Sequence, residues 1–294
     1  MNPLYLLAIF GLAAMATTKV TIQSAFGKKI MQTNTDALFY NTLLFAFAAV
    51  IAIPLTLFDG QALSLETCLY GAAFGILSII FQLSYANAFK TGSVSLTVLI
   101  NNFALVIPII FGAICYDESI TTNRIIGIFL LFISLFFSLE RDNRFGKFNF
   151  RWLLFTLICF ASGGFCSVIF KLHQHTVSKE QRSGFVLVAY AVAFTLSILF
   201  YLYKFKKTKE RITFQLTPKV LIPAAIAGII LGLYQKFSLF LVGIIDSAVI
   251  FPILGCTVTI FMTIFGVIFF KDKLKRIQLA GIAIGLVSIA LISI

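Results

Sequence analysis

Ten apolar runs follow one another along this chain, and each is long enough to cross a lipid bilayer. A helix rises about 1.5 Å per residue, so about 20 apolar residues span the hydrocarbon core. The runs are continuously apolar and do not alternate with polar residues, which favours helices over the strands of an outer-membrane barrel. We expect the spans at 4–26, 36–58, 67–89, 93–116, 123–139, 151–171, 184–203, 220–243, 246–270 and 277–294.

Composition excludes the soluble globular classes. Hydrophobic residues make up 60% of the 294 residues and charged residues only 12%, which is far from soluble averages. The first run lacks a basic leading segment and a small-residue cleavage pattern, so we expect it to be helix 1 and not a secretory signal. We therefore predict an all-α, multi-pass protein of the cell membrane. Abundant Phe and Ile and a preference for Lys over Arg point to the inner or plasma membrane of a bacterium.

The 23 Lys and Arg residues are distributed unevenly between the connections. Seventeen lie in the connections that follow odd-numbered spans, four lie in the others, and Lys19 and Lys236 fall within spans. The positive-inside rule places the seventeen in the cytoplasm and both termini outside. Because these cations are dispersed over many connections, the net charge of +12 does not indicate a nucleic-acid partner.

An internal repeat emerges when the second half is shifted by 154 residues. "IFGAICYDESITTNRIIGI" (110–128) then overlies "IFGVIFFKDKLKRIQLAGI" (264–282), which aligns Gly127 with Gly281 and Glu118 with Asp272. We expect two halves of five helices, 1–145 and 146–294. An odd number of helices per half requires the halves to be inverted, with a substrate site near the midplane. Chance similarity between apolar segments is the other interpretation of the match.

Each predicted half contains five helices, with an acidic residue (Glu118 or Asp272) after an apolar helix and a Gly-containing last helix. This pattern resembles the drug/metabolite transporter superfamily, in its EamA-like branch. The resemblance covers the whole chain. It implies a secondary transporter in which helices 1–4 and 6–9 surround a central cavity. The resemblance also implies cytoplasmic termini, whereas the count of Lys and Arg places the termini outside. We give more weight to the count, because the difference between seventeen and four cations is large.

Two lysines lie far inside predicted spans. Lys236 is about four residues, or roughly 6 Å, beyond the centre of its span, and Lys19 has a similar offset. A lysine at a helix centre costs about 2.5–3.5 kcal/mol on insertion scales, so it needs protein or water around it and a partner. All eleven Asp and Glu lie in connections or near helix ends, so no acidic partner is evident. We expect the partner to be a carboxylate, phosphate or sulfonate of the substrate; the other interpretation is that each lysine snorkels or binds backbone carbonyls.

Further polar and aromatic side chains are expected to line the same cavity. Three-residue spacing places Gln82 and Tyr85 on one helix face, and Thr97 and Asn101 share another. Interhelical hydrogen bonds explain the amides equally well, and a packing role explains the tyrosines. The predicted substrate-binding set is Lys19, Gln23, Asn41, Gln82, Tyr85, Asn101, Tyr190, Tyr234 and Lys236.

Other residues are assigned structural roles. Three GxxxG pairs, Gly71–Gly75, Gly228–Gly232 and Gly281–Gly285, allow close helix packing within the bundle or between protomers. Lys171 is expected to be a snorkelling anchor at the end of a span. His173 and His175 form an HxH in a connection, which is a weak metal candidate. The five cysteines have no CxxC spacing, so we expect packing roles and no metal site.

The sequence thus predicts a secondary transporter that moves a small polar organic metabolite by alternating access, with an anionic or zwitterionic substrate. The alternatives are an exporter of cationic or amphipathic drugs or metabolites, and a membrane receptor or structural protein without transport. There is no HExxH, no GxSxG and no phosphate-cradling glycine loop, so we expect no enzyme, no catalytic residues and no cofactor. The expected partners are the substrate and the lipid bilayer, and the GxxxG pairs also allow a homodimer.

Overall fold

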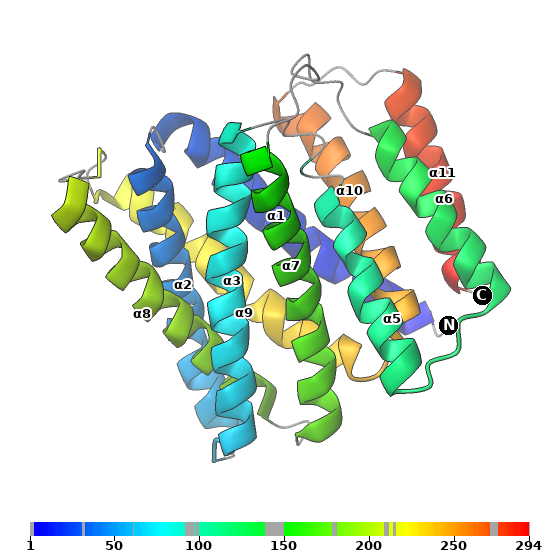
Figure 1. Cartoon of the computed structure of the whole chain (residues 1–294), viewed down its shortest axis with the longest axis horizontal. Helices are drawn as coiled ribbons and strands as arrows, with labels where there is room; N and C mark the ends of the chain where they lie inside the picture. Colours follow the sequence, from blue (N-terminus) through cyan, green and yellow to red (C-terminus); the bar gives the residue numbers. More distant parts are fainter. Residues whose placement is uncertain are drawn as a thin grey trace. The chain divides into compact units, whose positions relative to one another are not determined.

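The computed structural model describes residues 3–30, 33–60, 62–91, 97, 100–138, 150–177, 181–208, 212–213, 216–270 and 276–293. Helices account for nearly all of these residues, and none of those described lies in a strand (Figure 1). In chain order the helices are α1 (Pro3–Ile30), α2 (Asn34–Asp59), α3 (Leu65–Thr91), the 3₁₀ turn η1 (Phe103–Leu105), α5 (Val106–Cys115), α6 (Thr122–Ser138), α7 (Phe150–Thr176), α8 (Arg182–Thr208), α9 (Pro218–Val242), α10 (Ser247–Phe270) and α11 (Arg276–Ser293). The predicted all-α class is confirmed for this part of the chain.

Each predicted span coincides with helical structure. Within the described residues, six helices are long and apolar enough to cross a membrane: α1, α2, α3, α7, α8 and α9. The apolar stretches in the η1–α5, α6, α10 and α11 regions are shorter. Much of the first third of the fourth predicted span, between residues 92 and 99, lies outside the described residues. A spanning helix satisfies its own backbone hydrogen bonds, which is why continuous apolar runs fold this way in lipid.

Local sequence signals set the ends of α2. Thr33 and Asp36 form a capping box at its start, in which the Thr33 backbone N–H donates to the Asp36 carboxylate at 2.8 Å. Gly60 ends the helix with a φ of 65°, in the left-handed region that glycine adopts without steric cost. Asp59 is therefore fixed as the last residue of the helix.

The helices group into two compact units. Unit 1 comprises Met1–Thr17, Ile80–Lys171 and Ile244–Ile294, and unit 2 comprises Thr18–Ile79 and Leu172–Gly243. α1, α3 and α7 each contribute residues to both units.

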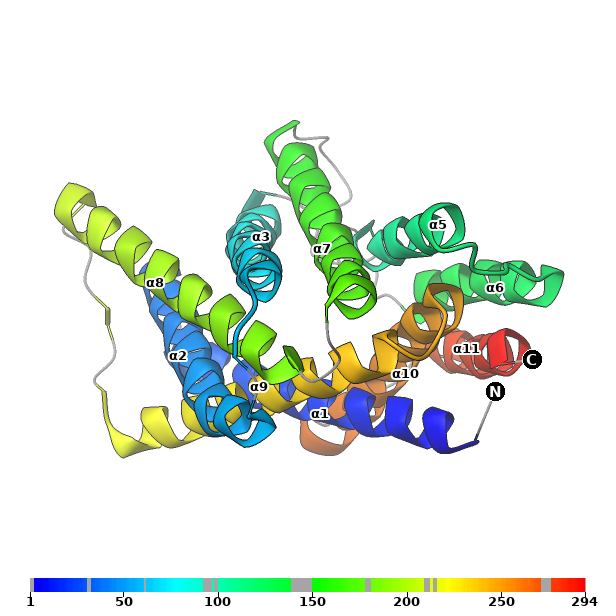
Figure 2. The ribbon, with the colours of Figure 1, turned by 90° about the horizontal axis from the view of Figure 1, so that it is seen from below.

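In unit 2, α2 packs against α8 and α9 (Figure 2). Glycines allow the closest approaches. A Cβ at Gly75 would overlap the backbone oxygen of Ala189 on α8, and a Cβ at Gly232 would lie 3.0 Å from the backbone oxygen of Ala48 on α2. Two of the predicted GxxxG pairs thus pack helices together within this unit.

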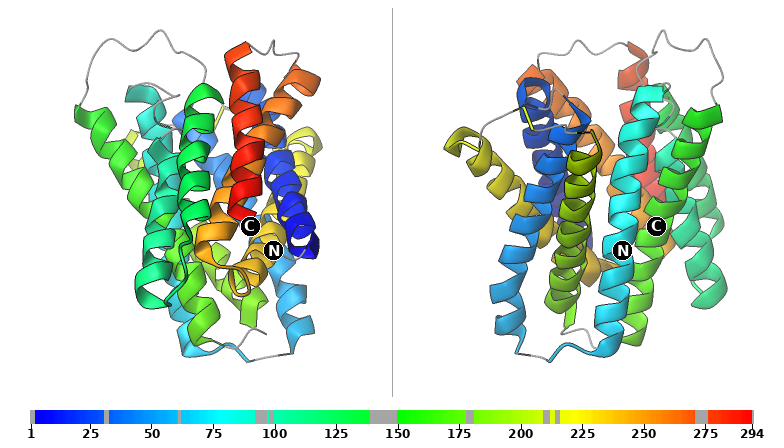
Figure 3. Two further views of the ribbon diagram at one scale, coloured as in Figure 1. Left: turned by 90° about the vertical axis from the view of Figure 1, so that its right-hand side faces the viewer. Right: turned by 60° about the vertical axis from the view of Figure 1, so that its left-hand side comes forward.

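In unit 1, α6 and α11 pack side by side and antiparallel (Figure 3). The Ser134 hydroxyl of α6 donates to the Gly281 carbonyl at 2.6 Å, and the Ser288 hydroxyl of α11 donates to the Gly127 carbonyl at 2.7 Å. Both hydroxyls are buried. Gly285 belongs to the same contact, because a Cβ there would lie 2.7 Å from the Ser134 hydroxyl. The third GxxxG pair therefore also packs within its unit.

Candidate functional site

Lys19 lies deep within α1 and is partly buried. It is about 24 Å along the helix axis from the first residue and about 16 Å from the last. Within the described part of the chain Lys19 has no hydrogen bond and no ion pair. Lys19 lies within the apolar stretch Pro3–Ile22 of this helix, where a cation is costly unless another group compensates its charge.

Lys236 has a partner, and the expectation that no acidic residue reaches it is wrong. Its Nζ lies 3.0 Å and 3.3 Å from the two carboxylate oxygens of Asp59. The pairing arises because α2 ends at Asp59 while Lys236 is only about 9 Å before the end of α9. About a quarter of each side chain is exposed, 25% for Lys236 and 24% for Asp59. Lys236 therefore does not need a substrate anion to compensate its charge, whereas for Lys19 we still expect one.

The other predicted site residues of unit 2 are less informative. Tyr190 is 3% exposed and stacks on Phe45 at 5.8 Å between ring centroids, a packing role. Asn41 on α2 and Tyr234 on α9 are partly buried. The Gln23 side chain lies outside the described residues.

In unit 1, two predicted site residues come together around a cysteine. The Cys159 thiol of α7 donates to the Asn101 side-chain oxygen at 3.4 Å, and Tyr85 of α3 also lies close to Cys159. Tyr85 stacks on Phe81 at 5.4 Å. Gln82 is partly buried on the same stretch of α3. Asn101 and Tyr85 therefore each lie near Cys159, for which only a packing role was predicted.

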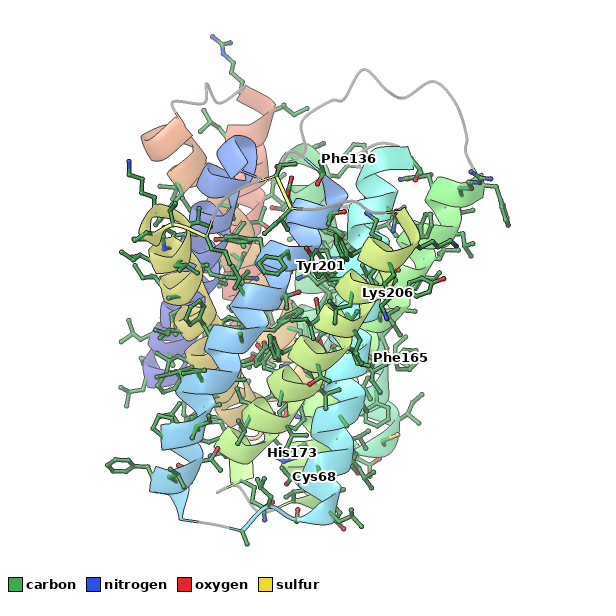
Figure 4. All side chains as sticks on the ribbon, turned by 90° about the vertical axis from the view of Figure 1, so that its left-hand side faces the viewer. Cys68, Phe136, Phe165, His173, Tyr201 and Lys206 are labelled. Carbon is green, nitrogen blue, oxygen red and sulfur yellow. The ribbon has the colours of Figure 1, made fainter. Side chains whose placement is uncertain are left out.

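A buried polar network in unit 2 was not predicted. His173 is fully buried, and its ring nitrogens lie 3.3 Å from the Thr67 hydroxyl and 2.9 Å from the Gln174 amide nitrogen. Figure 4 shows His173 beside the first turns of α3, near Cys68. Gln174 in turn accepts a hydrogen bond of 2.8 Å from Nε of Arg182. The placement of His173 in a connection is therefore wrong, because α7 continues to Thr176.

Lys171 is not a snorkelling anchor. It is 4% exposed, and its Nζ pairs with the Glu118 carboxylate at 2.5 Å and donates to the Ile245 carbonyl at 3.2 Å. Glu118 also accepts the backbone N–H of Ser247, the first residue of α10, at 2.7 Å. This correction has the same cause as the previous one: α7 extends past the predicted span end and keeps Lys171 inside unit 1.

The residues described include no group of three His, Cys, Asp or Glu side chains that could hold a metal ion. All five cysteines are free thiols. The groups available at the candidate site are therefore ammonium, guanidinium, carboxylate, amide and aromatic side chains, which bind and orient a solute by charge and hydrogen bonding.

Comparison with protein families bears on the first half of the chain. Residues 4–139 match the EamA-like transporter family. The match covers a little less than half of the 294 residues. The predicted resemblance is thereby confirmed for this segment, and the chain is a multi-pass membrane protein.

A solved structure shares the fold of nearly the whole chain. One solved structure, described only as "Crystal structure of protein", has a TM-score of 0.76 with this chain at 15% identity, covering 99% of this chain and 98% of the other. At that identity the likeness shows a shared fold and no shared function. Comparison with curated proteins finds no match.

The EamA-like segment is tied to the rest of the chain by ion pairs. Asp59 and Glu118 of the segment pair with Lys236 and Lys171 of the second half. In a third described pair the segment supplies the cation and the second half the anion: Arg124 contacts Asp246 at 2.9 Å. Lys19 also lies in the EamA-like segment. None of these ion pairs includes Lys19, so its charge has no anionic partner among the described residues.

Proposed function

We propose that this protein is a secondary transporter for a small polar organic metabolite that carries an anionic group, and that it works by alternating access between two inverted halves, 1–145 and 146–294. The match of residues 4–139 to a transporter family supports transport. No catalytic role is proposed for any residue.

The contact between α6 and α11 supports the inverted arrangement. Gly281 and Ser288 are the counterparts of Gly127 and Ser134 at the offset of 154 residues found in the sequence. Each serine donates to the glycine of the other helix, so the contact is self-complementary. Such reciprocity is what a two-fold axis produces between equivalent elements. Because the two helices are antiparallel, this axis is perpendicular to them, as in inverted-topology repeats.

Lys19 carries the proposed substrate class. This lysine lies within the apolar stretch of α1, Pro3–Ile22, and no anion compensates its charge among the described residues. A bound carboxylate, phosphate or sulfonate would supply the missing charge. Asn41 and Tyr234, which are partly buried in the same unit, are proposed to provide hydrogen bonds to the solute, together with Gln23.

Gln82, Tyr85 and Asn101 keep their predicted role as proposals for the solute's polar groups. Tyr190 and Lys236 also stay in the proposed set, but with secondary roles. Tyr190 already stacks on Phe45, and Lys236 already pairs with Asp59.

A binding screen followed by uptake tests this proposal. Purified protein is first melted in the presence of carboxylates, phosphates, sulfonates and amines, and the solute that raises the melting temperature is then used for uptake into proteoliposomes. We expect an anionic or zwitterionic solute whose uptake is saturable and accelerated by unlabelled solute on the other side. A purely cationic solute would contradict the proposed substrate class.

Lys19 variants locate the anion site. Lys19→Met is expected to reduce uptake at least tenfold while the protein stays inserted, since removing an uncompensated cation relieves an insertion cost. Lys19→Arg is expected to recover little, because a planar fork does not replace a compact ammonium. The matched control is Lys206→Met, which removes an exposed lysine from the last turn of α8. Normal uptake by Lys19→Met would refute the assignment.

A further inference from the structure

Two cations of unit 2 converge on the Asp59 carboxylate. Lys236 contacts both carboxylate oxygens, at 3.0 Å and 3.3 Å. Arg182 interacts electrostatically with the same carboxylate. The local charge of these three side chains is therefore +1 with Asp59 in place and +2 without it.

The geometry around Arg182 leaves it free to take part in binding. Its Nε donates to Gln174, and its guanidinium carbon lies 4.9 Å from the centroid of the Phe240 ring. In the described part of the chain neither Nη group makes a hydrogen bond. Phe240 lies one turn after Lys236 on the same face of α9, so the ring holds the guanidinium beside the ammonium.

The first turn of α8 completes this anion environment. Arg182 is the first residue of α8, so the start of this helix lies near the Asp59 carboxylate with which Arg182 interacts. The start of a helix carries unpaired N–H groups and a partial positive charge, which favour an anion. Lys236 of α9 thus contacts the carboxylate, and Arg182 at the start of α8 adds a second positive charge nearby.

Asp59 itself is poorly placed on its own helix. It is the last residue of α2, where the helix dipole has its negative end and a carboxylate is disfavoured. The site also lies at helix ends and is about one quarter exposed, so exchange with a solute needs no opening of a packed core.

We propose that Lys236, Arg182 and the first turn of α8 form a carboxylate-binding site, that Asp59 occupies it in this structure, and that the carboxylate of a solute takes the place of Asp59. The carboxylate class follows from Asp59, whose own group the site holds. That the displacing carboxylate belongs to a transported solute rests on the proposed function, whereas the site itself does not. Asp59 would then act as a tethered competitor that keeps Lys236 and Arg182 compensated between solutes.

Chemical rescue of Asp59→Ala by acetate tests the site without any transport measurement. We expect the purified variant to melt about 3 °C below the wild-type protein in sodium chloride. Replacing chloride by acetate at the same ionic strength is expected to restore most of this loss, because acetate binds the folded state at the vacated position. The wild-type protein is expected to show no acetate-specific shift, since Asp59 fills the site.

Two further variants make the test decisive. Asp59→Ala/Lys236→Met lacks the principal cation and should not respond to acetate, and Asp59→Ala/Arg182→Gln should lose about half of the response. An equal acetate shift in the wild-type protein or in the first double variant, or none in Asp59→Ala, would overturn the proposal.

Asp59→Ser, which keeps an oxygen near Lys236, is the second single variant in case Asp59→Ala does not fold, and it should respond in the same way. Failure of both variants to fold in acetate as well as in chloride would also contradict the proposal. A positive rescue with normal uptake by Lys19→Met would separate this site from the proposed transport site.

Discussion

Replacing Glu118 by glutamine leaves the Lys171 ammonium buried without its anion. The two side chains are only 5% (Lys171) and 7% (Glu118) exposed, so water cannot compensate the charge. Breaking a pair of this kind costs about 3–5 kcal/mol. Because Lys171 keeps the Ile245 carbonyl as a partner, and glutamine still offers an oxygen, we expect a loss near the lower end, about 3 kcal/mol, in the free energy of unfolding.

The opposite variant, Lys171→Met, is expected to cost less. Glu118 keeps the backbone N–H of Ser247, and the Ser247 hydroxyl lies 3.4 Å from its other oxygen. Hydrogen bonds to a carboxylate contribute about 1.5–3 kcal/mol each, so they hold most of its charge and we expect a loss of about 2 kcal/mol. The double variant Lys171→Met/Glu118→Gln contains no buried charge, and we expect it also to lose about 2 kcal/mol instead of the roughly 5 kcal/mol that simple addition gives.

A double-mutant cycle in detergent micelles measures this difference. The four proteins are unfolded reversibly with denaturant, and the coupling free energy is obtained from the two single variants and the double variant. The Lys236–Asp59 pair is the control, because its greater exposure predicts a coupling of about 1 kcal/mol or less. Additive losses at Lys171 and Glu118 would mean that the two groups do not interact, and the reasoning from burial would fail.

Three further predictions concern packing and orientation. Gly75→Ala places a Cβ against a backbone oxygen of α8 and should lower stability by about 1–3 kcal/mol, whereas Gly11→Ala, which meets nothing within 4 Å, should be neutral or stabilising in melting experiments. Ser134→Ala and Ser288→Ala should each cost about 1 kcal/mol of unfolding free energy, and unequal losses would argue against a symmetric contact. A single cysteine at Thr208, in a cysteine-free background, should resist impermeant thiol reagents in intact cells, because the polybasic connection around it is expected to be cytoplasmic.

The helices could be predicted because spanning length and apolarity are local properties of the sequence. Their ends were less predictable. Hydropathy ended the sixth span at Lys171, whereas α7 continues through His173 to Thr176, because polar residues extend a helix when they are buried against protein. The same error turned Lys171 into an anchor, although it lies in a buried ion pair.

The ion pairs could not be predicted from spacing. Asp59 and Lys236 are 177 residues apart, and nothing local to either residue indicates the other. Physical reasoning did predict that a lysine inside a span needs a partner. It could not say whether that partner is supplied by the protein, as for Lys236, or is absent from the described residues, as for Lys19. The proposed substrate class depends on this distinction, which required the fold.

The reciprocal bonds between α6 and α11 show how little sequence such a contact requires. Each serine donates to a carbonyl that retains a second lone pair, so neither helix loses a bond of its own ladder. Gly127 and Ser134 are seven residues apart, which places them on one face two turns apart. One glycine and one serine therefore encode both ends of the contact. A peptide with the sequence of α6 alone is expected to pair with an antiparallel copy of itself in a bilayer and to form the same two bonds.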